Sequence, residues 1–146
     1  MIFWLNKDSG MNLFVYGTLV FPELYTAITN RQRKKYKAIL KGYKRVSLEN
    51  LPFPALVKAS EHTQPGFLIK NIEPEELLLL IDYEGDMYEY EQLEVQLDHS
   101  VCDAIVFLLK PEFEGLISGE EWDMDGFSKL HLDSYLRECR RFREEL

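Results

Sequence analysis

One short stretch near the start of the chain decides how the rest is interpreted: Leu13-Phe14-Val15-Tyr16-Gly17-Thr18-Leu19. Its apolar residues are stopped by Gly17, which predicts a buried strand that enters a tight loop. A glycine lets the chain turn sharply and lets a ligand approach the backbone. Successive N–H groups in such a turn can hold a carboxylate or a phosphate. From the residues alone, an ordinary strand-to-helix turn explains this segment more simply.

Outward from this stretch, the hydrophobic pattern predicts strands in the middle of the chain and helices between and after them. A short helix is expected after Pro22, because proline suits the first helical position. Glu73-Pro74 predicts the start of a second helix, with Leu77 to Ile81 buried all round and Gly85 as its stop. Strands are expected at 12–16, 36–48 (with a bulge or a close backbone approach at Gly42), 55–57, 66–69, 93–97 and 103–109, and a closing amphipathic helix from residue 132. The pattern indicates a mixed α+β domain built on a strongly curved or barrel-like β-sheet.

Composition limits the classes of function. The chain has 146 residues, with 17 Lys and Arg against 25 Asp and Glu, and a formal net charge of −8. This charge argues against nucleic-acid binding, which depends on neutralising phosphates, and against docking on an anionic membrane. The longest apolar run, residues 104–109, is too short to span a bilayer. The start of the chain lacks the features of a secretory signal, so we predict a cytoplasmic protein.

The chain predicts a single domain over residues 11–146, preceded by a separable N-terminal extension at residues 1–10. Cys102 and Cys139 lack the spacing of a disulfide framework or a zinc ribbon. The three histidines show no ligand spacing, so no metal site and no cofactor are predicted. The basic run Arg31 to Lys35 is interpreted as a solvated loop or strand edge.

A second segment could carry chemistry: Asp82-Tyr83-Glu84-Gly85-Asp86-Met87-Tyr88. One of its carboxylates could act as a general base, with a pKa raised by burial and by like charges. A calcium loop fails on spacing, because Met87 stands where that loop needs glycine. From the residues alone, a polar turn between a helix and a strand explains the segment more simply.

The order of these pieces resembles the gamma-glutamylcyclotransferase-like family, in the branch of gamma-glutamylamine cyclotransferase and plant avirulence-induced-gene-like proteins. The resemblance covers about residues 11–144 and rests on motifs in a fixed order. These motifs are Leu13 to Leu19, Pro54-Ala55-Leu56-Val57, Gln64-Pro65-Gly66-Phe67-Leu68, and Leu80-Ile81-Asp82-Tyr83-Glu84-Gly85 with Tyr88, Val95 and Trp122 after it. One departure is Phe53, where many members of the family have tyrosine.

The resemblance implies a barrel-like fold with flanking helices and a cavity at one end. It also implies an enzyme that needs no cofactor and acts by intramolecular aminolysis. The substrate's α-amine attacks its own γ-amide carbonyl, which releases 5-oxoproline and a free amine or amino acid. Carried over to this chain, Glu84 is the general acid/base, and the substrate-binding residues are Tyr16, Gly17, Thr18, Leu19, Phe53, Pro54 and Tyr88.

Two other readings stay open. One is a non-catalytic module that binds a small carboxylate on the same fold, in keeping with Phe53 and the unusual N-terminus. The other is a structural, partner-binding domain with a closed or filled cavity. The expected partner is a small γ-glutamyl compound, and the sequence does not indicate the oligomeric state.

Overall fold

A closed five-stranded barrel organises the protein in a computed structural model that describes residues 11–144. The strands are β1 (Met11–Val15), β2 (Lys35–Ser47), β3 (Pro54–Ile72), β4 (Tyr88–Gln96) and β5 (Val101–Leu109). They pair in the order β1-β3-β2-β4-β5, with β1 parallel to β5 and every other pair antiparallel. This arrangement confirms the predicted α+β class with a barrel-like sheet and flanking helices.

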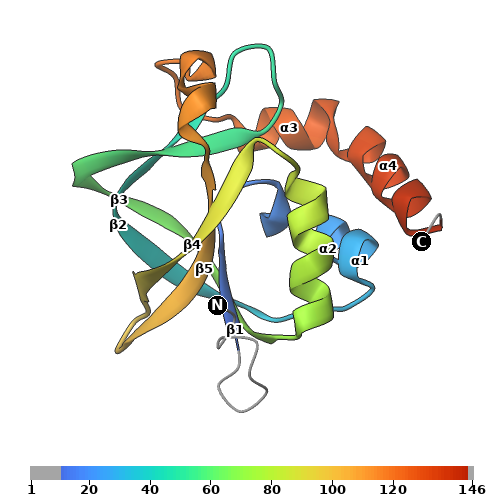
Figure 1. Ribbon diagram of the computed structural model, residues 1–146, viewed down its shortest axis with the longest axis horizontal. Coiled ribbons are helices and arrows are strands. Elements are labelled where there is room, and N and C mark those ends of the chain that lie inside the picture. Colours follow the sequence, from blue (N-terminus) through green and yellow to red (C-terminus); the bar gives the residue numbers. More distant parts are fainter. Residues whose placement is uncertain (1–10, 145–146) are drawn as a thin grey trace.

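The helices are α1 (Pro22–Thr29), α2 (Pro74–Glu84), α3 (Met124–Leu130) and α4 (Leu132–Glu144). Two short 3₁₀ helices, η2 (Thr18–Val20) and η3 (Pro111–Leu116), follow β1 and β5. Figure 1 shows α1, α2 and α4 gathered on one side of the barrel. Among the described residues, no helix is long and apolar enough to cross a membrane.

Alternation along β1 divides the core into two clusters. Leu13 and Val15 belong to a cluster that includes α1, α2 and α4, whereas Phe14 and Tyr16 belong to the cluster of the barrel interior. Successive side chains of a strand point to opposite faces. The first strand therefore runs between the helical layer and the barrel interior, and the loop that follows it emerges where the two meet.

The β2–β3 hairpin departs from one prediction. Strands were expected at 55–57 and 66–69, but β3 is continuous over Pro54–Ile72. Lys58 and Thr63, which lie between these segments, pair with Tyr43 and Lys41 of β2 while exposing their side chains, so strand pairing extends beyond the hydrophobic alternation. The predicted bulge at Gly42 is confirmed by a register shift between Lys41 and Tyr43 and by a φ of 83°.

Helix α2 confirms the predicted start and stop and corrects the expected burial. A capping box joins Glu73 to Glu76, and Gly85 is the C-cap. Leu77 and Leu80 are buried, but Leu78 is 66% exposed because only one face of α2 packs on the core. Because Gly85 is the C-cap, Glu84 is the last residue of α2.

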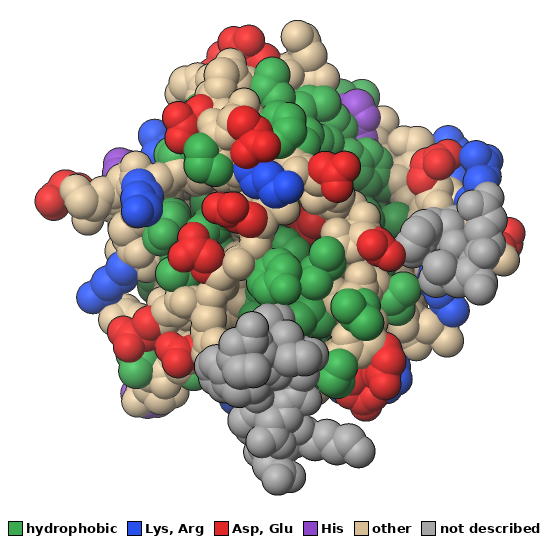
Figure 2. All heavy atoms as spheres, in the orientation of Figure 1, with side chains coloured by type: hydrophobic (Ala, Val, Ile, Leu, Met, Phe, Trp, Pro, Cys, Tyr) green, Lys and Arg blue, Asp and Glu red, His purple; other side chains and the backbone are tan. Residues whose placement is uncertain are grey.

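Charged groups are spread over the surface. Figure 2 shows acidic side chains scattered across one face, with hydrophobic side chains between them. In the basic run, Arg31 pairs with exposed Glu73 and Arg33 pairs with buried Glu76. Both cysteines are free, and residues 1–10 lie outside the described part of the chain.

Candidate active site

A small cavity lies where the loop after β1 meets the end of α2. The structure brings every residue predicted for the site to its wall: Tyr16, Gly17, Thr18, Leu19, Phe53, Pro54, Glu84 and Tyr88. Phe14, Val15 and Phe107 complete the lining. The cavity has a volume of about 20 Å³, roughly enough for one water molecule.

Gly17 shapes one wall of this cavity. A Cβ at Gly17 would lie 2.9 Å from Cγ of Pro54 and 3.2 Å from its Cδ, so only glycine allows this approach without a shift. The chain then makes one 3₁₀ turn, in which Val20 N donates to Gly17 O. Within residues 11–144, the amides of Gly17, Thr18 and Leu19 donate to no carbonyl or side chain. These donors remain free for a ligand.

Two tyrosines hold the wall around Glu84. The Tyr16 hydroxyl donates to the carbonyl of Phe107 over 2.6 Å, and the Tyr88 hydroxyl donates to the carbonyl of Pro54 over 2.5 Å. Burial, with nearby ionisable groups including Glu84, raises the pKa of both phenols. Both hydroxyls therefore stay protonated and keep their bonds to backbone carbonyls.

Glu84 is partly buried, and no described residue forms a hydrogen bond or an ion pair with its carboxyl group. Burial raises the pKa of Glu84 to about 8. An acid with no compensating donor is costly to ionise away from water. The carboxyl group is thus well suited to accept a cationic ligand group that enters the cavity.

Sequence reasoning missed several neighbours of this site. The Thr18 hydroxyl is 2.6 Å from the hydroxyl of Tyr83, a bond that ties the loop to α2. Tyr135 of α4 lies close enough for Glu84 to help raise its pKa to about 12, after burial and Cys139. Phe14 could have been found from its alternation with Tyr16 along one strand. Tyr135 and Phe107 carry no such signal, because tertiary packing alone brings their elements to the loop.

A larger hollow of about 880 Å³ shares Tyr16 with this cavity, but Glu84 is not among its lining residues. It is bordered mainly by β2 and β3 residues, including Lys37, Arg45 and Gln64. We place the candidate active site at the smaller cavity, because an acid with a raised pKa and free amide donors meet there. No group of three or more potential metal ligands occurs within residues 11–144.

Comparison with known families gives a match over most of the chain. The family model described as "Gamma-glutamyl cyclotransferase, AIG2-like" matches residues 13–124, from the first strand to the start of α3. The chain belongs to this gamma-glutamyl cyclotransferase, AIG2-like family. The matched region contains both the loop after β1 and Glu84.

The chain is also similar to individual proteins and solved structures over most of its length. AIG2-like protein D of Arabidopsis thaliana is 28% identical over 142 residues, which is 92% of this chain and 90% of that protein. The solution structure of another Arabidopsis thaliana protein aligns with a TM-score of 0.65 and 26% identity over 92% of this chain and 82% of that one. A structure described as a gamma-glutamyl cyclotransferase aligns with a TM-score of 0.63 and 13% identity, over 90% and 86% of the two chains, and shows the shared fold.

Proposed function

We propose that this AIG2-like protein is a gamma-glutamyl cyclotransferase that converts a γ-glutamyl amine or short γ-glutamyl peptide to 5-oxoproline and a free amine or amino acid. The observation that carries the proposal is the shared cavity of Glu84 and the Gly17–Leu19 loop. Family membership and a fold neighbour described as a gamma-glutamyl cyclotransferase support it.

In the proposed reaction, Glu84 acts on the substrate's α-amino group. The α-ammonium cannot attack until it loses a proton, and a carboxylate within hydrogen-bond reach both attracts the cation and accepts that proton. The α-nitrogen then forms a bond to the γ-carbonyl carbon, which gives a tetrahedral oxyanion. Collapse breaks the original C–N amide bond: Glu84 returns the first proton to the departing nitrogen, and the α-nitrogen gives up its second proton, so that the amine leaves protonated and the ring nitrogen keeps one hydrogen. No water is consumed.

The loop after β1 has the complementary role. The substrate's α-carboxylate would accept hydrogen bonds from the free amides of Gly17, Thr18 and Leu19. Holding both ends of the glutamyl unit folds it into the shape that closure of the five-membered ring requires. Such fixed geometry supplies much of the rate of an intramolecular reaction.

Substrate entry requires the cavity to widen, because its volume of about 20 Å³ is smaller than a γ-glutamyl group. Phe53 is partly buried and lies in the irregular segment just before Pro54 begins β3, so movement of its side chain is one way to widen the cavity. Its ring packs at an angle against Tyr88, with centroids 6.1 Å apart.

One alternative function is a non-catalytic module that binds a small carboxylate on the same fold, and the observation in its favour is Phe53, where many members of the family have tyrosine. Incubation with a panel of γ-glutamyl amides and peptides, with 5-oxoproline measured by mass spectrometry, separates the two. The enzyme releases 5-oxoproline from at least one compound. Binding of a γ-glutamyl compound in calorimetry without any release would support the non-catalytic module instead.

A further inference from the structure

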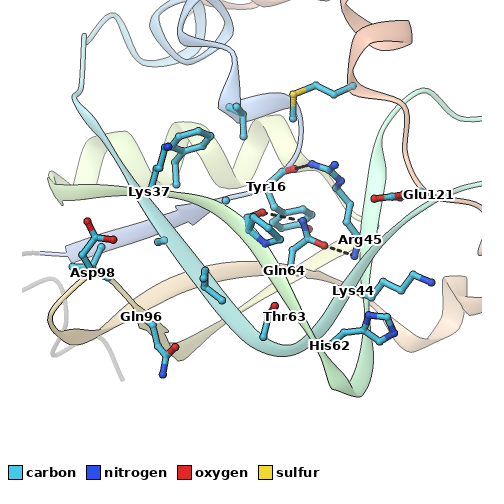
Figure 3. Close-up of a pocket in the computed structure, with 18 residues that line it drawn as sticks. Tyr16, Lys37, Lys44, Arg45, His62, Thr63, Gln64, Gln96, Asp98 and Glu121 are labelled. Atoms are coloured by element: carbon cyan, nitrogen blue, oxygen red, sulfur yellow. Dashed lines mark hydrogen bonds between the residues drawn. The ribbon is translucent and has the colours of Figure 1, made fainter.

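The strongest unexplained feature outside the cavity wall is Arg45, on β2. Its guanidinium Nη1 donates to the carbonyl oxygen of Tyr16 over 2.9 Å, and its charged plane lies 5.2 Å from the ring centroid of Trp122. Within residues 11–144, no carboxylate lies within 4.0 Å of this guanidinium, and its Nε is buried without a partner. Figure 3 shows Arg45 reaching toward Tyr16 beside Gln64. Arg45 is only partly buried, and the acid whose charge acts on it is Glu121. A partly desolvated charge kept without an ion pair calls for another explanation than stability.

The peptide bond that Arg45 holds is the one that precedes Gly17. In a planar trans peptide, the carbonyl oxygen of Tyr16 and the amide hydrogen of Gly17 point in opposite directions. Fixing the carbonyl from the Arg45 side therefore fixes the direction of the Gly17 N–H. A hydrogen bond from a charged donor is stronger than a neutral one, and polarising a carbonyl strengthens the N–H of the same peptide as a donor.

A second route from Arg45 reaches the same glycine. The indole of Trp122, which packs against the guanidinium, donates through Nε1 to the carbonyl of Pro52 over 2.8 Å. Two residues later, the ring of Pro54 packs where a Cβ on Gly17 would collide. Arg45 therefore contacts the loop directly at Tyr16 and indirectly through Trp122, which holds the Pro52–Pro54 segment against Gly17.

We propose that Arg45 is a positioning residue that orients and polarises the Tyr16–Gly17 peptide, so that the Gly17 N–H is presented to the ligand as a donor. This inference rests on the proposed function for its catalytic consequence. The side chain must be arginine, because a planar guanidinium can stack on Trp122 and donate to Tyr16 at once, whereas a lysine ammonium is a point charge.

The test compares Arg45→Met with Lys44→Met, which removes the neighbouring cation of β2; Lys44 lines the larger hollow but has no role in the contacts above. On a substrate that the wild type turns over, Arg45→Met should lower kcat/KM by roughly tenfold or more, and Lys44→Met should leave it within about twofold. The kcat/KM of Arg45→Lys, which keeps the charge, should lie between those of the two methionine variants. Arg45→Lys replaces Arg45→Met in this comparison if Arg45→Met does not fold. An unchanged kcat/KM in a folded Arg45 variant overturns the inference.

A readout that needs no turnover separates this inference from the proposed function. In protein labelled with ¹⁵N-glycine, the Gly17 amide resonance should shift in Arg45→Met and stay in place in Lys44→Met, while that of Gly115, in η3, moves in neither. A Gly17 resonance unmoved in the Arg45 variant contradicts the positioning role. If the wild type turns over no γ-glutamyl compound but Gly17 shifts as expected, the proposed function fails and the positioning of the peptide stands.

Discussion

Glu84, the last residue of α2, and Gly17, in the loop that follows β1, line the same cavity. The carboxyl group of Glu84 has no hydrogen-bond or ion-pair partner among residues 11–144. Gly17 begins a run of three backbone amides that have no acceptor among the same residues. The two regions are joined directly by the bond between Thr18 and Tyr83. A substrate with an ammonium and a carboxylate would satisfy both at once.

Replacing Glu84 by glutamine should lower turnover by about 10²–10⁴-fold while preserving the fold. Glutamine is nearly isosteric but cannot accept the α-ammonium proton, and general-base catalysis contributes about 10²–10⁴-fold. The measurement is 5-oxoproline release by mass spectrometry, with circular dichroism to check the fold. A Glu84→Gln variant that works at the parental rate would rule out the proposed mechanism.

The same variant should change how stability depends on pH. The folded-state pKa of Glu84 is raised from 4.5 to about 8, so the folded state keeps a proton that the unfolded state loses. The wild type therefore loses stability as the pH rises from 4.5 towards 8, by up to about 1.4 kcal/mol for each pH unit in this window. Thermal unfolding of both proteins across this range should show that the stability of Glu84→Gln, relative to that of the wild type, increases as the pH rises. Parallel curves would contradict the raised pKa.

Activity should have an acidic limb set by Glu84. The free enzyme needs the carboxylate form, so kcat/KM should rise with pH up to about 8, the pKa of Glu84. A bound α-ammonium favours the carboxylate, so the limb of kcat should lie at lower pH than that of kcat/KM. Steady-state rates across the pH range measure both limbs. A kcat/KM limb near the usual carboxyl pKa would place the base elsewhere.

Gly17→Ala should damage the site through Pro54. The new Cβ would lie 2.9 Å from Cγ of Pro54, a ring that begins β3. We expect a loss of about 1–3 kcal/mol in unfolding free energy from overpacking, together with a fall in kcat/KM. Gly115→Ala is the matched control, because a Cβ there meets nothing within 4 Å. Chemical denaturation and the 5-oxoproline assay measure both effects, and equal behaviour of the two variants would show that the close approach at Gly17 is unimportant.

The residues that cluster at the site could be predicted because they occupy two short segments with distinctive local chemistry. Gly17 stops an apolar strand, and Gly85 ends a helix directly after Glu84. Arg45 and Tyr135 could not be predicted in the same way, since their roles depend on the barrel bringing β2 and α4 to the loop. The continuity of β3 was also missed, because backbone pairing with β2 needs no hydrophobic alternation.

The most direct test of the central claim is the fate of the γ-glutamyl unit when the reaction runs in H₂¹⁸O with a substrate carrying ¹⁵N in its α-amine. Intramolecular aminolysis predicts 5-oxoproline that retains the ¹⁵N in its ring and contains no ¹⁸O, with no glutamate formed. Glutamate labelled with ¹⁸O would show that water, and not the α-amine, attacks the γ-carbonyl, and would contradict the proposed role of Glu84 and the Gly17 loop.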